Sequence, residues 1–195
     1  MAIQLGILIF DDVEVLDFCG PIEVFGAAND VTNPDPFNIH IIAEEMRIIN
    51  ARKNLNVMPT HSIDNCPKLD ILLVPGGEGT RPILKRNRLL QWINNQYASL
   101  DYLLSVCTGS IVLGKAGLLN NIEATTHHTC FDELKNVSPS TKVITNQRYV
   151  ESGNIVTSAG ISAGMDMSLF MVEKLLGKEI TQEAIREMEY NGYDQ

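Results

Sequence analysis

The sequence predicts a doubly wound α/β sandwich, in which helices cover both faces of a parallel sheet. Short apolar runs bounded by Gly, Pro or Asn alternate with segments of helical period, as in successive βαβ units. The first run, residues 3–10, is apolar throughout, which suits a strand buried on both faces. The length of 195 residues, with 45% hydrophobic and 20% charged residues, fits a single globular domain over 1–195.

The predicted strands are apolar or β-branched runs with turn residues at their ends. They cover residues 3–10, 37–43, 69–74, 102–106, 124–126, 149–151 and 155–157. Gly153-Asn154 supplies the turn chemistry of a hairpin between the last two runs. Between residues 43 and 69 lies a polar excursion, in which we expect only short extended pieces near Ile48 and Val57.

The predicted helices follow from apolar period and from residues that start or stop a helix. They cover residues 21–28, 89–99, about two turns after Cys107, 131–136, 162–176 and 181–189. Proline suits the first position of a helix, so Pro21 is expected to open one and residues 11–20 to form a loop. Gly177 is expected to end the long helix, and Thr181 to cap the last one.

The charge balance argues against nucleic-acid and membrane partners. Fifteen Lys and Arg face 24 Asp and Glu, giving a net charge of −9, and no basic cluster stands out. The N-terminus lacks the positively charged region that begins a signal peptide, and Asp11-Asp12 interrupts its apolar segment early. No apolar segment approaches the roughly 18 residues that span a bilayer. We therefore expect a cytoplasmic protein that acts on a small molecule.

The cysteines predict neither a zinc site nor a disulfide framework. They lack C-x-x-C spacing, are too sparse for a secreted scaffold, and are Cys19, Cys66, Cys107 and Cys130. His127 and His128 precede Cys130 closely, but no fourth ligand is evident and adjacent side chains diverge in direction. We expect reduced thiols and no metal.

Cys107 stands where an apolar run meets the small-residue opening of a helix. In an open parallel sheet, a side chain at this joint points into the crevice where ligands bind. The unpaired N–H groups and the positive end of the helix dipole favour the thiolate. Ser105-Val106-Cys107-Thr108-Gly109 also has the small-x-nucleophile-x-small form of a nucleophile elbow. From these residues alone, a nucleophile and a small packing residue are equally good interpretations.

Two further segments follow predicted strands and are expected at the same crevice. Gly76 and Gly77 let the backbone approach closely and, with the N–H of Thr108, would form a two-donor anion site, unless they are simply a tight turn. Asp17 lies between apolar neighbours, so burial is expected to raise its pKa. If Asp17 touches Cys107, the two groups titrate as a pair.

Five motifs together resemble the DJ-1/PfpI superfamily over nearly the whole chain. They are Asp17-Phe18-x-Gly20-Pro21-x-Glu23-Val24-Phe25, Val74-Pro75-Gly76-Gly77, Ser105-Val106-Cys107-Thr108-Gly109, Ala124-Thr125-Thr126-His127 and Thr157-Ser158-Ala159-Gly160. The Leu-Asp-Phe-x-Gly-Pro phrase and the Cys-Thr pair resemble the isonitrile hydratase branch, also called cyclohexyl-isocyanide hydratase. The same phrases occur in sensor-like domains of AraC-type regulators.

The resemblance implies a flavodoxin-like sandwich of the class I glutamine amidotransferase type, a homodimer, and a cysteine enzyme without metal or organic cofactor. It implies Cys107 as the nucleophile, Asp17 as the acid/base carboxyl and Thr108 as the polar neighbour that takes part in hydration. Gly77 resembles the glycine on the oxyanion side. Thr108 stands where protease-like members carry histidine, which argues against that branch. The AraC-type regulators continue into a DNA-binding domain beyond the end of this sequence.

The resemblance therefore implies hydration of an isonitrile to an N-substituted formamide. Cys107 would attack the terminal carbon, Asp17 would supply the proton that this carbon needs, and Asp17 and Thr108 would orient the water. The alternatives are another cysteine-dependent activity, such as glyoxalase-type hydration or amide hydrolysis, and a non-enzymatic sensor whose Cys107 oxidises.

The crevice is expected to hold a small organic substrate with an apolar body. A histidine near the cysteine would act as its base or line the pocket. The expected lining residues are Val15, Phe18, Gly76, His127 and Ile161.

Overall fold

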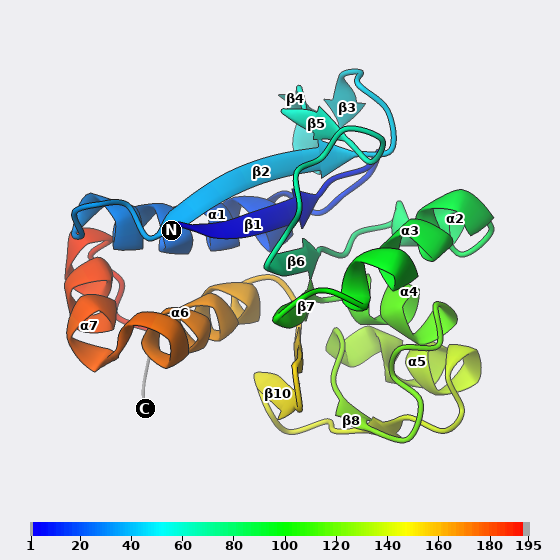
Figure 1. Cartoon of the computed structure of the whole chain (residues 1–195). Coiled ribbons are helices and arrows are strands. Elements are labelled where there is room, and N and C mark those ends of the chain that lie inside the picture. Colours follow the sequence, from blue (N-terminus) through cyan, green and yellow to red (C-terminus); the bar gives the residue numbers. More distant parts are fainter. Residues whose placement is uncertain (1, 193–195) are drawn as a thin grey trace.

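The computed structural model describes residues 2–192, and within them one sheet contains seven strands (Figure 1). Across the sheet they are β10 (Tyr149–Ser152), β11 (Ile155–Ser158), β7 (Tyr102–Val106), β6 (Ile71–Val74), β1 (Ile3–Leu8), β2 (Phe37–Ala43) and β5 (His61–Ser62). All neighbours are parallel except β10 and β11, which form the predicted hairpin. The apolar runs of β6 and of the end of β1 are completely buried, as expected for strands covered on both faces.

Helices cover both faces of the sheet. In Figure 1, α1 (Val15–Asp30), α6 (Ala163–Leu176) and α7 (Lys178–Glu187) lie together on one side, and they pack against one another. The other side carries α2 (Thr80–Ile83), α3 (Asn87–Tyr97), α4 (Gly109–Lys115) and α5 (Phe131–Val137). This arrangement confirms the predicted doubly wound α/β sandwich. In the part of the chain that the structure describes, every helix falls short of the length and apolarity needed to cross a membrane.

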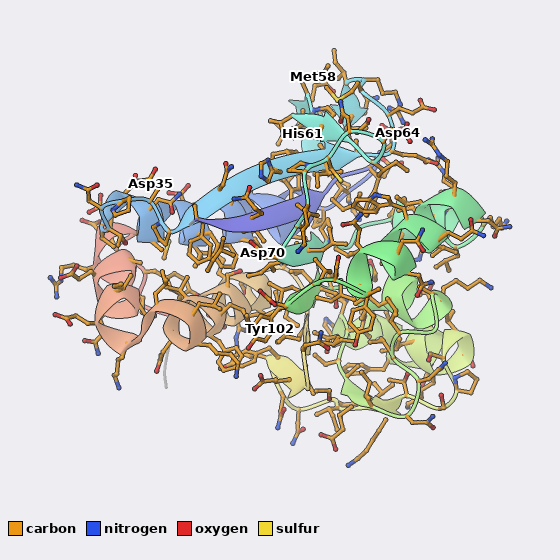
Figure 2. The ribbon with its side chains drawn as sticks, in the orientation of Figure 1. Asp35, Met58, His61, Asp64, Asp70 and Tyr102 are labelled. Carbon is orange, nitrogen blue, oxygen red and sulfur yellow. The ribbon has the colours of Figure 1, made fainter. Side chains whose placement is uncertain are left out.

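Short strands form two further pairs outside the sheet. β3 (Ile49–Asn50) pairs with β4 (Asn56–Val57), and β8 (Glu123–Ala124) with β9 (Lys142–Val143). The first pair belongs to the polar excursion, which projects beyond the edge of β2, where Met58, His61 and Asp64 are labelled in Figure 2. Within it, the 3₁₀ turn Arg52–Asn54 is tied back to the loop after β1, because the Arg52 N–H donates to the Val13 carbonyl at 3.0 Å.

The predicted start of the first helix was wrong. Helix α1 begins at Val15 and contains Pro21 in its second turn, so Asp17 belongs to the first helical turn rather than to a loop. A proline normally disfavours helical geometry in the residue before it, because its ring meets that residue's Cβ. Here the preceding residue is Gly20, which has no Cβ, and the helix passes through.

The predicted start of the last helix was also wrong. Helix α7 begins at Lys178, directly after Gly177, whose φ of 92° breaks the chain direction between α6 and α7. Thr181 does not cap it; its hydroxyl donates to the Gly177 carbonyl, four residues earlier, at 3.1 Å. The short helix α2 was not predicted, since a single turn leaves too little periodicity in the sequence.

Candidate active site

Cys107 forms a strained joint between β7 and α4. Its φ of 55° lies in the left-handed region, which costs a non-glycine residue about 1–2 kcal/mol. Hydrogen bonds hold the joint: the Cys107 N–H donates to the Ser158 carbonyl at 3.1 Å, and the Thr126 hydroxyl donates to the Cys107 carbonyl at 2.9 Å. A Cβ on Gly109 would lie 2.0 Å from the Val74 carbonyl oxygen, so only glycine lets α4 begin this close to β6.

Asp17 is fully buried, and its carboxyl interacts directly with the Cys107 thiol. Its Oδ2 accepts a hydrogen bond from the Gly76 N–H at 3.0 Å, whereas Oδ1 has no hydrogen-bond partner among residues 2–192. Burial raises the pKa of Asp17 to about 7; the Gly76 N–H opposes the rise and the negative charge of Glu14 adds to it. Asp17 is therefore a carboxyl that can gain or lose a proton near neutral pH.

Cys107 is a protonated thiol at neutral pH, because burial and then the charge of Asp17 raise its pKa to about 12. The Thr108 N–H opposes this rise without offsetting it. The start of the helix lowers the pKa of the thiol as expected, through the Thr108 N–H, but burial and the charge of Asp17 outweigh this effect. Helix α4 has only seven residues, and the effect of its N-terminus is smaller than the loss of solvent around a sulfur in a residue that is 7% exposed.

The Gly76-Gly77 loop positions side chains instead of pointing two free donors into the crevice. The Gly76 N–H is engaged by Asp17, and the Gly77 N–H donates to the Thr108 hydroxyl at 3.0 Å. The Gly77 N–H is thus engaged by Thr108 in this structure, while the other expected donor, the Thr108 N–H, interacts with the Cys107 sulfur. The oxyanion role of Gly77 and Thr108 stays a prediction. The backbone path holds this loop in place: Gly77 forms a bridge with Val13, and its φ of 122° is a conformation that favours glycine.

A cavity of about 280 Å³ opens beside Cys107, and its wall combines charged and polar side chains with apolar surface. Its lining residues are Glu14, Arg52, Lys53, Gly77, Glu78, Arg81, Cys107, Thr108, His127, Thr129, Cys130 and Ile161. The expected apolar lining is present in part, through Ile161, beside charged residues that were not expected. Of the expected residues only His127 and Ile161 line the cavity, Gly76 lies beneath it beside Asp17, and Val15 is not part of its wall. Phe18 is 2% exposed and belongs to the core.

The charged wall comes from segments that the sequence did not link to Cys107. Arg52 and Lys53 come from the polar excursion, and no local motif announces that this excursion folds back over the crevice. Arg81 reaches across from α2, where its guanidinium is 2.6 Å from Glu133 and donates to the Gly77 carbonyl at 3.2 Å. Glu14 is close to Asp17 in the sequence, but the helix that brings it to the cavity was not predicted.

His127 presents a neutral imidazole to the cavity. Burial lowers its pKa, and the neighbouring His128 lowers it further. Its Nδ1 lies 2.8 Å from the Thr129 hydroxyl. Gly160 leaves the room for this ring, because a Cβ there would lie 2.0 Å from the imidazole. Across residues 2–192, no group of three or more His, Cys, Asp or Glu side chains is arranged to hold a metal ion.

Comparisons with known proteins point to one family. The model of the DJ-1/PfpI family matches residues 4–174. Isonitrile hydratase from Pseudomonas putida is 36% identical over 190 residues, which cover 97% of this chain and 79% of that enzyme. The HTH-type transcriptional regulator GbdR from Pseudomonas aeruginosa is 28% identical over 185 residues, which cover 95% of this chain and 50% of the regulator.

Solved structures show the same fold. A THiJ/PfpI family protein from Pseudomonas syringae superposes with a TM-score of 0.89 at 31% identity, covering 100% of this chain and 77% of that protein. Drosophila melanogaster DJ-1beta superposes with a TM-score of 0.86 at 18% identity, covering 98% of this chain and 100% of that protein.

Proposed function

The chain belongs to the DJ-1/PfpI family, and we propose that it is a cysteine-dependent isonitrile hydratase. One observation carries the proposal beyond the likeness to the Pseudomonas putida enzyme. A buried carboxyl, Asp17, interacts with the strained Cys107, with one oxygen unpartnered and with a pKa near neutrality. Such a group can take the proton of the thiol and return it during the reaction.

The engaged glycine N–H groups favour isonitrile chemistry over amide hydrolysis. Attack on an amide carbonyl builds negative charge on oxygen, and such reactions depend on donors held ready for it. An isonitrile has no oxygen to stabilise in the first step; its terminal carbon needs a nucleophile and then a proton. The Gly76 N–H donates to Asp17 and the Gly77 N–H donates to Thr108. These hydrogen bonds position the carboxyl that carries the proton and are not directed at an anion in the cavity.

The proposed reaction adds water across the isonitrile carbon in two stages. Ionised Asp17 accepts the proton of the Cys107 thiol, and the sulfur attacks the terminal carbon. Asp17 returns this proton to the same carbon, which gives a thioimidate linked to Cys107. Asp17, which is then ionised again, takes a proton from a water beside Thr108 as the water oxygen adds to the thioimidate carbon, and passes this proton to the nitrogen. The C–S bond breaks, and the remaining hydroxyl proton goes to the sulfur. The products are the N-substituted formamide and the regenerated thiol.

Ligand sensing without turnover is the second candidate function. The chain matches about half the length of GbdR, a transcriptional regulator, and the match covers nearly the whole chain. A thiol that stays protonated at neutral pH also suits a pocket that binds without chemistry. A homodimer, a cytoplasmic location and a single domain over 1–195 stay predictions under either function.

A substrate panel tests the proposal. Alkyl isonitriles, 2-oxoaldehydes and amides are incubated with the wild-type protein, Cys107→Ala and Cys66→Ala, and products are followed by mass. Cys66 is a free thiol that is not part of the cavity wall, so its variant controls for loss of a cysteine as such. We expect formamide from the wild type and Cys66→Ala, and none above background from Cys107→Ala.

Two other outcomes of this panel contradict the proposal. Turnover of an oxoaldehyde or amide without any formamide, at high protein concentration, would assign the site to other cysteine chemistry. Saturable binding of a panel compound with no product would support ligand sensing.

A further inference from the structure

Two consecutive cations stand on the wall of the cavity beside Cys107. Arg52 and Lys53 lie on the 3₁₀ turn of the polar excursion, and both line the cavity. Backbone bonds fix the turn: the Arg52 N–H donates to the Val13 carbonyl at 3.0 Å and the Ala51 N–H to the Leu55 carbonyl at 2.8 Å. Lys53 is held in the left-handed region with a φ of 61°. The fold thus maintains a strained turn that brings two positive side chains to this wall.

The guanidinium of Arg52 makes only long ion pairs with its carboxylate neighbours. Its Nε lies 3.3 Å from Glu14 and its Nη1 lies 3.6 Å from Glu78. In residues 2–192 the side-chain N–H groups of Arg52 make no hydrogen bond, unlike its backbone N–H. By contrast, the Arg81–Glu133 and Arg86–Glu44 pairs are hydrogen-bonded at 2.6 and 2.9 Å. A guanidinium offers five N–H donors in a planar fork. Arg52 therefore presents unused donors to the cavity.

Lys53 has no carboxylate partner in the described part of the chain, and its neighbourhood contains few competitors. The carboxylates on the cavity wall are Glu14 and Glu78. Glu78 has a side chain that is 70% exposed, so a ligand can displace it at little cost. Glu14 is mostly buried and faces Arg52. Because the whole chain carries a net charge of −9, long-range electrostatics do not attract anions to this cavity. An anionic ligand must therefore be bound by local contacts.

We propose that the substrate carries a carboxylate, which Arg52 and Lys53 bind while the reactive carbon reaches Cys107. A carboxylate is planar and accepts two parallel bonds from a guanidinium fork, which gives both affinity and orientation. With the proposed hydratase activity, on which this inference rests, the substrate class is a small isocyano carboxylate. The two cations then bind the carboxylate, while Ile161 contributes apolar contact on the same wall.

Matched substrates test the charge preference. Isocyanoacetate and methyl isocyanoacetate share the reacting group and differ in the negative charge. We expect the ratio of their kcat/KM values, acid over ester, to fall about fivefold in Lys53→Gln and by at least as much in Arg52→Gln, as for loss of a partly exposed charge pair. Lys68 is exposed and is not part of the cavity wall, so Lys68→Gln is expected to keep the wild-type ratio. An unchanged ratio in both cavity variants overturns the proposal.

Alkylation of Cys107 separates this inference from the proposed activity. Iodoacetate carries a carboxylate and iodoacetamide is neutral, and both alkylate a thiol without catalytic turnover. The rate ratio, iodoacetate over iodoacetamide, is expected to fall in Lys53→Gln and Arg52→Gln and not in Lys68→Gln. If this ratio falls while no isonitrile is hydrated, the result supports the carboxylate site and contradicts the proposed hydratase activity. If isonitriles are hydrated but neither ratio depends on Lys53 or Arg52, the result supports the hydratase activity and contradicts the carboxylate site.

Discussion

The Asp17→Asn variant is expected to hydrate isonitriles about a hundredfold to a thousandfold more slowly than the wild type, the usual loss when a general acid/base is removed. Its Cys107 is expected to react faster with iodoacetamide at pH 8. Above pH 7 Asp17 is ionised, and its charge raises the pKa of the thiol. Asparagine removes that charge, so the thiolate becomes easier to form while the proton carrier is lost.

The same pair determines the pH dependence of the wild type. Asp17 accepts the thiol proton only when ionised, so kcat/KM is expected to rise as the pH rises through about 7, the pKa of Asp17. Asp17→Asn should lack this rise. Asp30→Asn, at the other end of α1, is the matched control. Unchanged turnover in Asp17→Asn would remove Asp17 from the mechanism, and slower alkylation would show that its charge does not act on Cys107.

The Gly109→Ala variant is expected to lose about 3 kcal/mol of unfolding free energy, at the upper end for overpacking. The added Cβ would meet the Val74 carbonyl oxygen at 2.0 Å, and its three nearest atoms all belong to the backbone of Val74 and Pro75, so no flexible side chain can move away. Urea unfolding followed by circular dichroism measures the loss.

Gly26→Ala is the control for this substitution. Gly26 lies inside α1, and a Cβ there would meet nothing within 4 Å. Because alanine favours helix over glycine, this variant is expected to gain about 0.5–1 kcal/mol. Equal stability of the two variants would show that the joint between β7 and α4 is not sterically constrained at Gly109.

Much of the sheet could be predicted because its strands are apolar runs with glycine or proline at their ends. The joint at Cys107 could be predicted for a related reason, since small residues on both sides of a nucleophile leave few other conformations. The start of α1 could not be predicted by the usual preference of proline for helix starts. The steric conflict between a proline ring and the preceding Cβ is absent when that residue is glycine, as at Gly20, so the outcome depends on two residues together.

The wall of the candidate site could not be predicted, because it depends on long-range placement. Arg52 and Lys53 reach the cavity only after the excursion has folded back on Val13. Gly77 carried a correct signal for close backbone approach, but the partner of its N–H is Thr108, 31 residues away. Sequence patterns indicate local geometry well, whereas the direction of one N–H depends on contacts between distant segments.

The most direct test of a nucleophilic Cys107 is the mass of the protein during turnover. Wild-type protein is mixed with an isonitrile, quenched with acid within milliseconds to seconds, and digested for peptide mapping. A thioimidate adds the full mass of the isonitrile, and we predict this increase on the peptide that contains Cys107 and not on those with Cys66 or Cys130. Formamide produced at the wild-type rate by Cys107→Ala, with no adduct on the wild-type Cys107 peptide at any time, would contradict the mechanism.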